Sequence, residues 1–190
     1  NWRYTGTNGH MQVAGIARKL TYQPAAGIAT DELGYGANFT GSWHPWASLM
    51  GCTNTANRSP VEKSRFLGQY ATGRGINRYL QDVNGLGLDA TFDAANGLQP
   101  IPSTGWFLSY ENWWTQKWIS VFSYGESNSD LTATLPGNTY KAATYLSANL
   151  IWLPVERMGV GMEYLYGTRE NKDGQSGEAD RVQMSFQYKF

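Results

Sequence analysis

Cysteine and histidine are scarce in this sequence of 190 residues. The single cysteine, Cys52, has no partner for an intrachain disulfide and stands apart from any cluster of metal-ligating residues. The two histidines, His10 and His44, lie in no nucleophile pattern with a serine elbow, so a hydrolase triad is not supported. We therefore predict no enzymatic activity, no cofactor and no metal site.

An excess of charge of either sign is also missing. The chain carries 15 acidic and 15 basic side chains, whereas proteins that neutralise nucleic-acid phosphates need a basic excess or a basic stripe. We therefore expect no nucleic-acid partner, and net charge alone points to no other partner.

A long apolar run is the third absence. No segment approaches the roughly twenty apolar residues of a membrane-spanning helix, and the sequence starts at Asn1 without an initiator Met or a signal segment. We expect that a signal has been removed or that the chain is part of a longer protein. The low mean hydropathy of the sequence does not exclude a transmembrane β-barrel, because barrel strands expose only alternate residues to lipid.

Apolar and polar residues instead alternate along most of the sequence, which predicts β-strands. No convincing amphipathic helix is predicted. In the segment 33–44 one set of residues is apolar and the other is small and polar: Leu33, Tyr35, Ala37, Phe39, Gly41 and Trp43 against Gly34, Gly36, Asn38, Thr40, Ser42 and His44. The strands are predicted at about 9–22, 32–44, 63–72, 104–114, 117–127, 139–152, 156–167 and 179–190.

The connections between these strands alternate in length. Tight turns are predicted at 114–118 and 152–158, and long polar loops at 73–103, 126–139 and 168–180. Short turns at one end and long loops at the other are typical of bacterial outer-membrane barrels. The short turns are flanked by tryptophans that predict an aromatic girdle at one membrane interface: Trp113, Trp114, Trp118 and Trp152. In a soluble β-sandwich the same tryptophans would be core residues.

Four segments carry a family resemblance: GRGINRY (73–79), LDATFDAANGLQ (88–99), ENWW (111–114) and the stretch 148–190, which combines Asn-Leu-Ile-Trp, a proline turn, Glu-Tyr-Leu-Tyr-Gly and a terminal Phe. In this order they resemble the C-terminal half of the DcaP-like porins, which are trimeric outer-membrane diffusion channels. The resemblance implies a bacterial outer-membrane location, lipid contact and a homotrimer. It also implies small organic anions, such as dicarboxylates, as permeants.

This chain departs from the family in length and at two positions. Family members are about twice as long and have sixteen strands, whereas about eight strands are predicted here. We therefore interpret residues 1–190 as a single β-barrel domain, the C-terminal portion of a longer porin. The segment 45–62 is an inserted loop where the family has a short turn, and Asn77 stands where the family usually has Gly.

Charged residues on the inward-facing positions are the candidates for the pore lining, because selectivity depends on the charges around a constriction. The basic candidates are Arg18, Arg65, Lys141 and Arg181 on strands, and Arg74 and Arg78 in the long loop. Glu111 and Glu163 are the acidic candidates on strands. This balance predicts a modest anion preference.

Phe190 ends the apolar alternation of the last strand. An open sheet edge cannot face lipid, and the resemblance implies that this terminal Phe is recognised by the barrel-assembly machinery. Two alternatives to a porin stay open at this point: a small eight-stranded outer-membrane barrel with a structural, binding or lipid-modifying role, and a soluble β-sandwich binding module.

Overall fold

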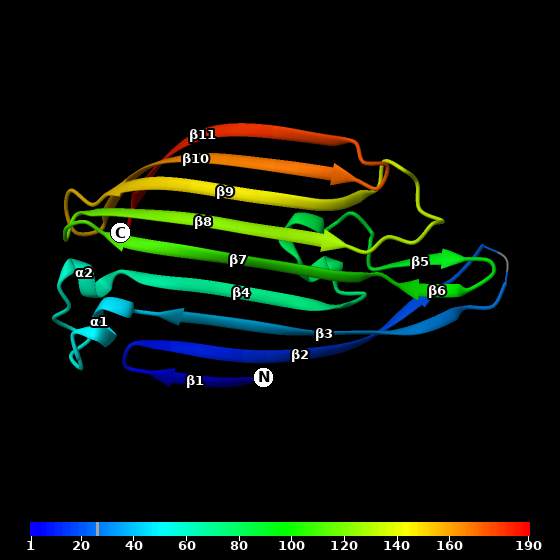
Figure 1. Cartoon of the computed structure of the whole chain (residues 1–190), viewed down its shortest axis with the longest axis horizontal. Coiled ribbons are helices and arrows are strands. Elements are labelled where there is room, and N and C mark those ends of the chain that lie inside the picture. The colour runs from blue at the N-terminus through cyan, green and yellow to red at the C-terminus, as the bar shows by residue number, and fades with distance from the viewer. Residues whose placement is uncertain (26) are drawn as a thin grey trace.

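The computed structural model describes residues 1–25 and 27–190, and over these residues nine strands form one antiparallel sheet in the order β1-β2-β3-β4-β7-β8-β9-β10-β11 (Figure 1). These strands are β1 (Trp2–Gly6), β2 (Gly9–Tyr22), β3 (Thr30–Trp43), β4 (Arg65–Arg74), β7 (Pro102–Trp113), β8 (Trp118–Ser129), β9 (Tyr140–Trp152), β10 (Met158–Asn171) and β11 (Ser176–Tyr188). The hairpin of β5 (Ala90–Asp93) and β6 (Gly97–Pro100) forms a separate small sheet. The predicted all-β antiparallel fold is confirmed.

Every strand predicted from the alternation has a counterpart in the large sheet, but the loops differ from expectation. Strand β1 is too short to show a clear alternation, and the β5–β6 hairpin lies inside the predicted loop 73–103. The predicted long loop 168–180 is wrong, because the β10–β11 ladder continues to the pair Glu170 and Ser176. A tight turn at 172–175 therefore joins these strands.

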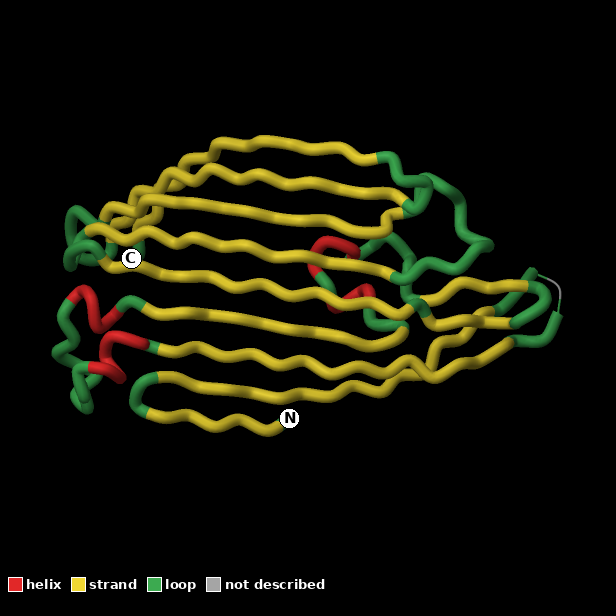
Figure 2. The backbone as a smooth tube through the Cα atoms, in the orientation of Figure 1, coloured by secondary structure: helices red, strands yellow, loops and turns green. Residues whose placement is uncertain are grey.

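Short helices connect β3 to β4 at the end of the sheet that carries the predicted tight turns 114–118 and 152–158 (Figure 2). They are α1 (Pro45–Leu49) and α2 (Pro60–Lys63), and both begin at a proline, whose missing N–H costs nothing at the first helical position. The Glu62 carboxylate accepts hydrogen bonds from the backbone N–H and the hydroxyl of Ser59, at 2.7 and 2.6 Å, which closes a capping box. The predicted inserted loop 45–62 is thus partly helical.

The segment 45–62 packs onto the neighbouring strand ends. The buried Arg58 donates to the carbonyl oxygen of Thr7 at 2.8 Å and to Oδ1 of Asn8 at 2.7 Å, both in the β1–β2 turn. The Trp46 indole donates to the Tyr110 hydroxyl of β7 at 3.0 Å. These contacts attach the segment to strands on both sides of it.

The strand register divides the side chains of the large sheet between an outer face and an inner face, because directly paired residues share a side and successive residues alternate. The outer face carries large apolar and aromatic side chains, including Trp43, Tyr35, Phe39, Tyr70, Leu108, Phe122, Leu146, Leu150, Met162, Tyr164, Met184 and Phe186. The inner face carries mainly glycine, serine, threonine, amide and charged residues, including Arg18, Gly36, Asn38, Gln69, Ser109, Ser123, Ser147 and Arg181. The apolar face is the uncovered one: Phe39 is 47% exposed and Met184 is 76% exposed.

The hydrophobic core forms where the segment 75–101 folds back against the inner face. This segment contains the 3₁₀ turns η1 (Asn77–Tyr79) and η2 (Gln81–Val83). Its apolar side chains pack with residues of the sheet in one cluster of Ala71, Leu80, Val83, Leu88, Ile101 and Tyr140. Gly36 of β3 permits this close approach, since a Cβ there would lie 2.8 Å from Cγ2 of Ile76.

The large sheet is open, with β1 and β11 as its edges. Strand β11 is exposed along almost its whole length. Among the described residues, no helix has the length and apolar character needed to cross a membrane.

Candidate functional site

The inner face is lined with hydroxyl groups that bond to one another across strands. Ser109 and Ser123 lie opposite each other on β7 and β8, and their hydroxyl oxygens are 2.8 Å apart. Ser103 and Ser129 make the same contact at 3.2 Å nearer the folded segment 75–101. These serines are small and mostly buried, and their hydroxyl groups bond to each other between the strands.

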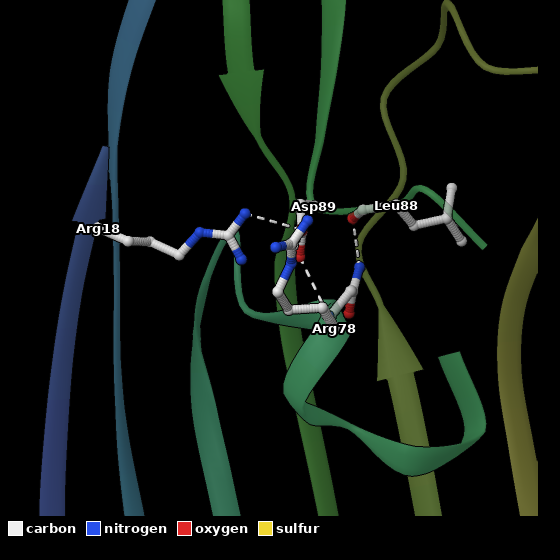
Figure 3. A network of polar contacts seen from close by, with 5 residues as sticks. Arg18, Arg78, Leu88 and Asp89 are labelled. Carbon is white, nitrogen blue, oxygen red and sulfur yellow. Dashed lines mark hydrogen bonds and ion pairs between the residues drawn. The ribbon is translucent and has the colours of Figure 1, made fainter. Parts of the chain in front are cut away.

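A three-residue charge network holds the folded segment 75–101 to the inner face (Figure 3). The Arg18 guanidinium on β2 donates to Oδ2 of Asp89 at 2.8 Å, and Nε of Arg78 donates to the same oxygen at 2.9 Å. The backbone N–H of Arg78 donates to the other carboxylate oxygen of Asp89 at 3.0 Å. Two basic groups thus share one carboxylate, and the network keeps an excess of one positive charge.

Asp89 is ionised under ordinary conditions. Burial of this carboxylate tends to raise its pKa, but the hydrogen bonds from Arg78 and Arg18 outweigh burial and hold the pKa below its usual value. Beside it, the buried Asn77 amide donates to the carbonyl oxygen of Leu88 and accepts from the Ser129 hydroxyl at 3.4 Å. Asn77, noted as a departure from the family pattern, therefore fixes the turn to both its own loop and the sheet.

Arg65 and Glu111 form a second ion pair on the inner face, with Nη2 of Arg65 3.0 Å from Oε2 of Glu111. They lie directly opposite each other on β4 and β7. The Trp113 indole donates to the other carboxylate oxygen at 2.9 Å. Trp113 therefore lies on the inner face, and its predicted place in an outer aromatic girdle is wrong.

Glu163 and Arg181 lie on the inner faces of β10 and β11. Glu163 accepts a hydrogen bond from the Gln183 amide, its direct neighbour across the strands. Arg181 is opposite Leu165 and is exposed. Within the described part of the chain, Arg181 takes part in no ion pair, so its charge is not compensated by a contact.

Two of the predicted lining residues lie elsewhere. Arg74 is the last residue of β4 and pairs with Tyr35, so it belongs to the outer face and not to the loop. Lys141 is displaced by a register shift in the β9–β10 ladder, which places Tyr140 opposite Asn171.

The Nζ of Lys141 lies 2.6 Å from Oε1 of Glu170, which continues the outer row of Tyr164 and Tyr166. The prediction of Lys141 on the inner face was wrong because Lys141 is the extra residue of a bulge, between Tyr140 opposite Asn171 and Ala142 opposite Glu170, where the alternation is interrupted. Sequence reasoning also missed Arg169, which was assigned to a loop. It pairs with Ala143 on the inner face, and its guanidinium lies over the Tyr140 ring at 5.6 Å from the ring centroid. Arg18 lies over the Tyr79 ring in the same way, at 5.8 Å.

Aromatic residues gather on the outer face near the tight turns. Trp118 and Trp152 are direct neighbours on β8 and β9, with ring centroids 5.9 Å apart and ring planes at 18°. A second aromatic row at the same end crosses β3, β4 and β7 and consists of Trp43, Phe66 and Tyr110. This arrangement is typical of an interfacial girdle.

The outer face becomes polar towards the long loops. The apolar stretch of β3 covers the ten residue steps from Leu33 to Trp43, which is about 34 Å along an extended strand. With a tilt of about 35–45°, this length covers about 24–28 Å of membrane, close to the apolar band of roughly 25 Å in outer-membrane barrels. An exposed ion pair of Lys19 and Asp31, at 2.7 Å, lies at the end of this stretch.

Phe190 lies just beyond β11 and is fully exposed, with its ring edge against Tyr188 at a centroid distance of 5.3 Å. Its role as an assembly signal stays a prediction.

A long antiparallel sheet with an exposed apolar face and a polar face covered by a folded loop is the architecture of a transmembrane β-barrel wall. No known family and no protein of curated function matches this chain. Among solved structures, the chain is similar to the crystal structure of the outer membrane channel DcaP of Acinetobacter baumannii, with a TM-score of 0.68 and 17% sequence identity. The similarity covers 99% of this chain and 61% of that channel. It shows a porin-like fold, and the chain spans about three fifths of the length of that channel.

Proposed function

We propose that this chain forms part of the wall of an outer-membrane diffusion channel for small hydrophilic solutes. The observation that carries the proposal is the contrast between the two faces of the sheet. Large apolar side chains stay exposed on the outer face, where lipid would solvate them, and serines and glycines line the inner face. In a soluble β-sandwich a second sheet would cover the apolar face, so this exposure favours the membrane.

The open edges of the sheet support the view that the chain is one portion of a larger barrel. Strands β1 and β11 carry unpaired backbone groups, and such groups cannot remain in lipid without a partner strand. Coverage of 61% of the solved channel agrees with a barrel that contains further strands. Assembly as a homotrimer in the outer membrane belongs to this proposal through the family resemblance.

The segment 75–101 would narrow the lumen, because it lies against the inner face of β3, β4 and β7. It brings Arg78 and Asp89 into the space in front of the sheet. Ion pairing reduces the charge that a permeating solute would meet, since Arg65 is matched by Glu111. A modest preference for small organic anions then rests on Arg181, Arg169 and the excess positive charge around Asp89, opposed by the carboxylate of Glu163, whose partner Gln183 is uncharged.

Planar-bilayer recordings of the natural full-length protein test this proposal. We expect ion conductance with a modest anion preference under a salt gradient. The substitution Arg181→Gln should shift the reversal potential towards cations, because it removes an uncompensated charge. The matched control is the double substitution Arg65→Gln with Glu111→Gln, which removes a pair without net charge and should leave the reversal potential unchanged.

A purified, folded protein that never conducts would refute the channel function. A cation-selective parent channel would refute only the anion preference.

A further inference from the structure

Three aromatic side chains lie around one cavity on the inner side of the sheet, two of them on its strands and one on the folded segment 75–101. Phe107 of β7 and Tyr145 of β9 are on the inner face and are 40% and 38% exposed, and Tyr79 of η1 is 55% exposed. All three line one cavity of about 460 Å³ between the folded segment 75–101 and the sheet. Small-molecule sites usually measure roughly 300–1,000 Å³ and combine aromatic walls with a few polar groups.

The floor of this cavity is shaped by a glycine between two rings. Phe107, Gly125 and Tyr145 form one row across β7, β8 and β9. The two aromatic residues are two strands apart, and their backbones are therefore about 10 Å from each other. A Cβ at Gly125 would lie 3.0 Å from the Cβ of Phe107 and 2.9 Å from the carbonyl oxygen of Trp106. The glycine keeps the space between the rings open down to the backbone.

Polar groups of the cavity can both donate and accept hydrogen bonds. Ser109 and Ser123 lie one row below the rings, with their hydroxyl oxygens 2.8 Å apart. The amide side chains of Gln69 on the sheet and Gln81 on the folded segment complete the polar lining. Hydroxyl and amide groups match the hydroxyls of a solute, which also donate and accept.

The side chains directed into the cavity carry no charge among the described lining residues. Glu126 borders the cavity, but strand alternation places its side chain on the outer face, where its carboxylate accepts a hydrogen bond from Tyr124. The nearby Arg18 and Arg78 are engaged with Asp89. A dicarboxylate would therefore lose its hydration here without gaining a basic partner, which is unfavourable.

We propose that this cavity, formed by Phe107, Tyr145, Tyr79 and the hydroxyl and amide groups between them, is a subsite for an uncharged polyhydroxylated solute of about the size of a monosaccharide. The apolar C–H faces of such a ring pack against aromatic side chains, and its hydroxyls bond to serine and glutamine. This inference rests on the proposed channel function and adds a second solute class to it. The wall would thus hold neutral solutes beside the folded segment and attract anions at Arg181.

Saturation-transfer NMR with D-glucose on the full-length protein in detergent tests the subsite directly. We expect saturation transfer to the ring C–H protons of glucose. Phe107→Ala and Tyr145→Ala should each weaken binding by roughly two- to tenfold, the loss expected for one aromatic contact. Tyr145→Phe should retain most of the signal, because it keeps the ring.

Ile151→Ala is the matched control, since Ile151 is on the inner face of the same strand and outside the cavity. Heat-modifiable electrophoretic mobility would verify that each variant is folded. Unchanged signal in Ile151→Ala, together with loss in Tyr145→Ala, would support the subsite. Absence of saturation transfer to glucose, or an equal signal in a folded Phe107→Ala, Tyr145→Ala double variant, would overturn it.

Ion conductance of the same preparation in planar bilayers separates this inference from the proposed function. A conducting channel without a glucose signal would overturn the subsite alone. Absence of conductance would overturn the channel function, and glucose binding would then have to be explained without transport.

Discussion

The two faces of the large sheet differ in which side chains they expose and which they cover. On the outer face, Phe39 and Leu150 are 47% and 42% exposed, and the described chain provides nothing that covers them. On the inner face, Ser109 and Ser147 are 8% and 4% exposed. In a water-soluble protein the apolar face would be covered and the polar face open. The difference agrees with the proposed channel, in which lipid surrounds the outer face and the inner face provides the polar environment.

The inner face is itself divided by the folded segment 75–101. Near the long loops this segment covers β3, β4 and β7 and forms the hydrophobic core. Towards the tight turns the face is instead organised by the ion pair of Arg65 and Glu111. The channel proposal therefore depends on the folded segment for shape and on a few charges for selectivity.

The strongest test of the two-face comparison places a charge on each side of β3. Phe39→Arg puts a guanidinium near the middle of the outer apolar band, and we expect it to destabilise the folded protein in lipid by roughly 2–4 kcal/mol. Phe39 lies opposite Val13 and Tyr70, so no acidic partner is at hand. Urea unfolding of the full-length protein in lipid vesicles would measure the change in unfolding free energy.

Thr40→Arg is the neighbouring control. Thr40 is on the inner face opposite Gln12 and Gln69, where a long basic side chain can extend into water. We expect little change in unfolding free energy there. Equal penalties for Phe39→Arg and Thr40→Arg would contradict the assignment of the two faces.

Asp89→Asn tests how the folded segment sets the charge of the inner face. The substitution leaves Arg18 and Arg78 without their shared carboxylate. One uncompensated charge about 8 Å from a permeating ion, at a dielectric constant of about 40–80, contributes about 0.5–1 kcal/mol. Because the charge attracts an anion and repels a cation by this amount, we expect the anion-to-cation permeability ratio to rise roughly five- to thirtyfold, as measured by reversal potentials under a salt gradient.

Asp93→Asn provides the matched control for this charge change. Asp93 lies in the β5–β6 hairpin, where its carboxylate accepts from the backbone N–H of Ala95 and from the Asn96 amide, at 2.8 and 2.9 Å. It has the same charge as Asp89 but no contact with Arg18. Similar shifts for Asp89→Asn and Asp93→Asn would show that the network near Asp89 does not control selectivity.

The division into two faces could be predicted from the sequence because it depends on neighbouring residues only. Alternation along 33–44 identifies the outer position of Phe39 without knowledge of any partner strand. The same local reasoning failed at Lys141, where a register shift interrupts the alternation. It also failed for segment 168–180, whose polar residues continue a strand pair beyond the apolar band.

The charge balance of the inner face could not be predicted, because ion pairs join residues far apart in the chain. Arg18 and Asp89 are separated by 71 positions, and their contact depends on the folding of segment 75–101 onto the sheet. The residues next to Asp89 in the sequence do not indicate that its carboxylate will pair with the guanidinium of Arg18 on β2. The cavity beside Tyr145 has the same origin, since its walls come from four strands and a folded loop.

Lowering the pH should change the anion preference in the same direction as Asp89→Asn, but gradually and by a smaller amount, because it protonates only part of the Asp89 carboxylates. Because contacts with Arg78 and Arg18 hold the pKa of Asp89 below its ordinary value, the attachment of the folded segment is stabilised at pH values above about 4. This contribution is lost as pH falls from about 4 through the lowered pKa of the attached carboxylate.

We expect the anion preference of the channel to increase over this pH range, because protonation of Asp89 leaves Arg18 and Arg78 unpaired. Reversal potentials of the parent channel and of Asp89→Asn are compared at each pH, so that effects of acid common to both channels cancel. The difference between the two channels should be constant above about pH 5 and should shrink below about pH 4. If the two curves stay parallel down to the acid limit of the folded protein, Asp89 is not protonated over that range, and the predicted release of Arg18 and Arg78 by acid is wrong.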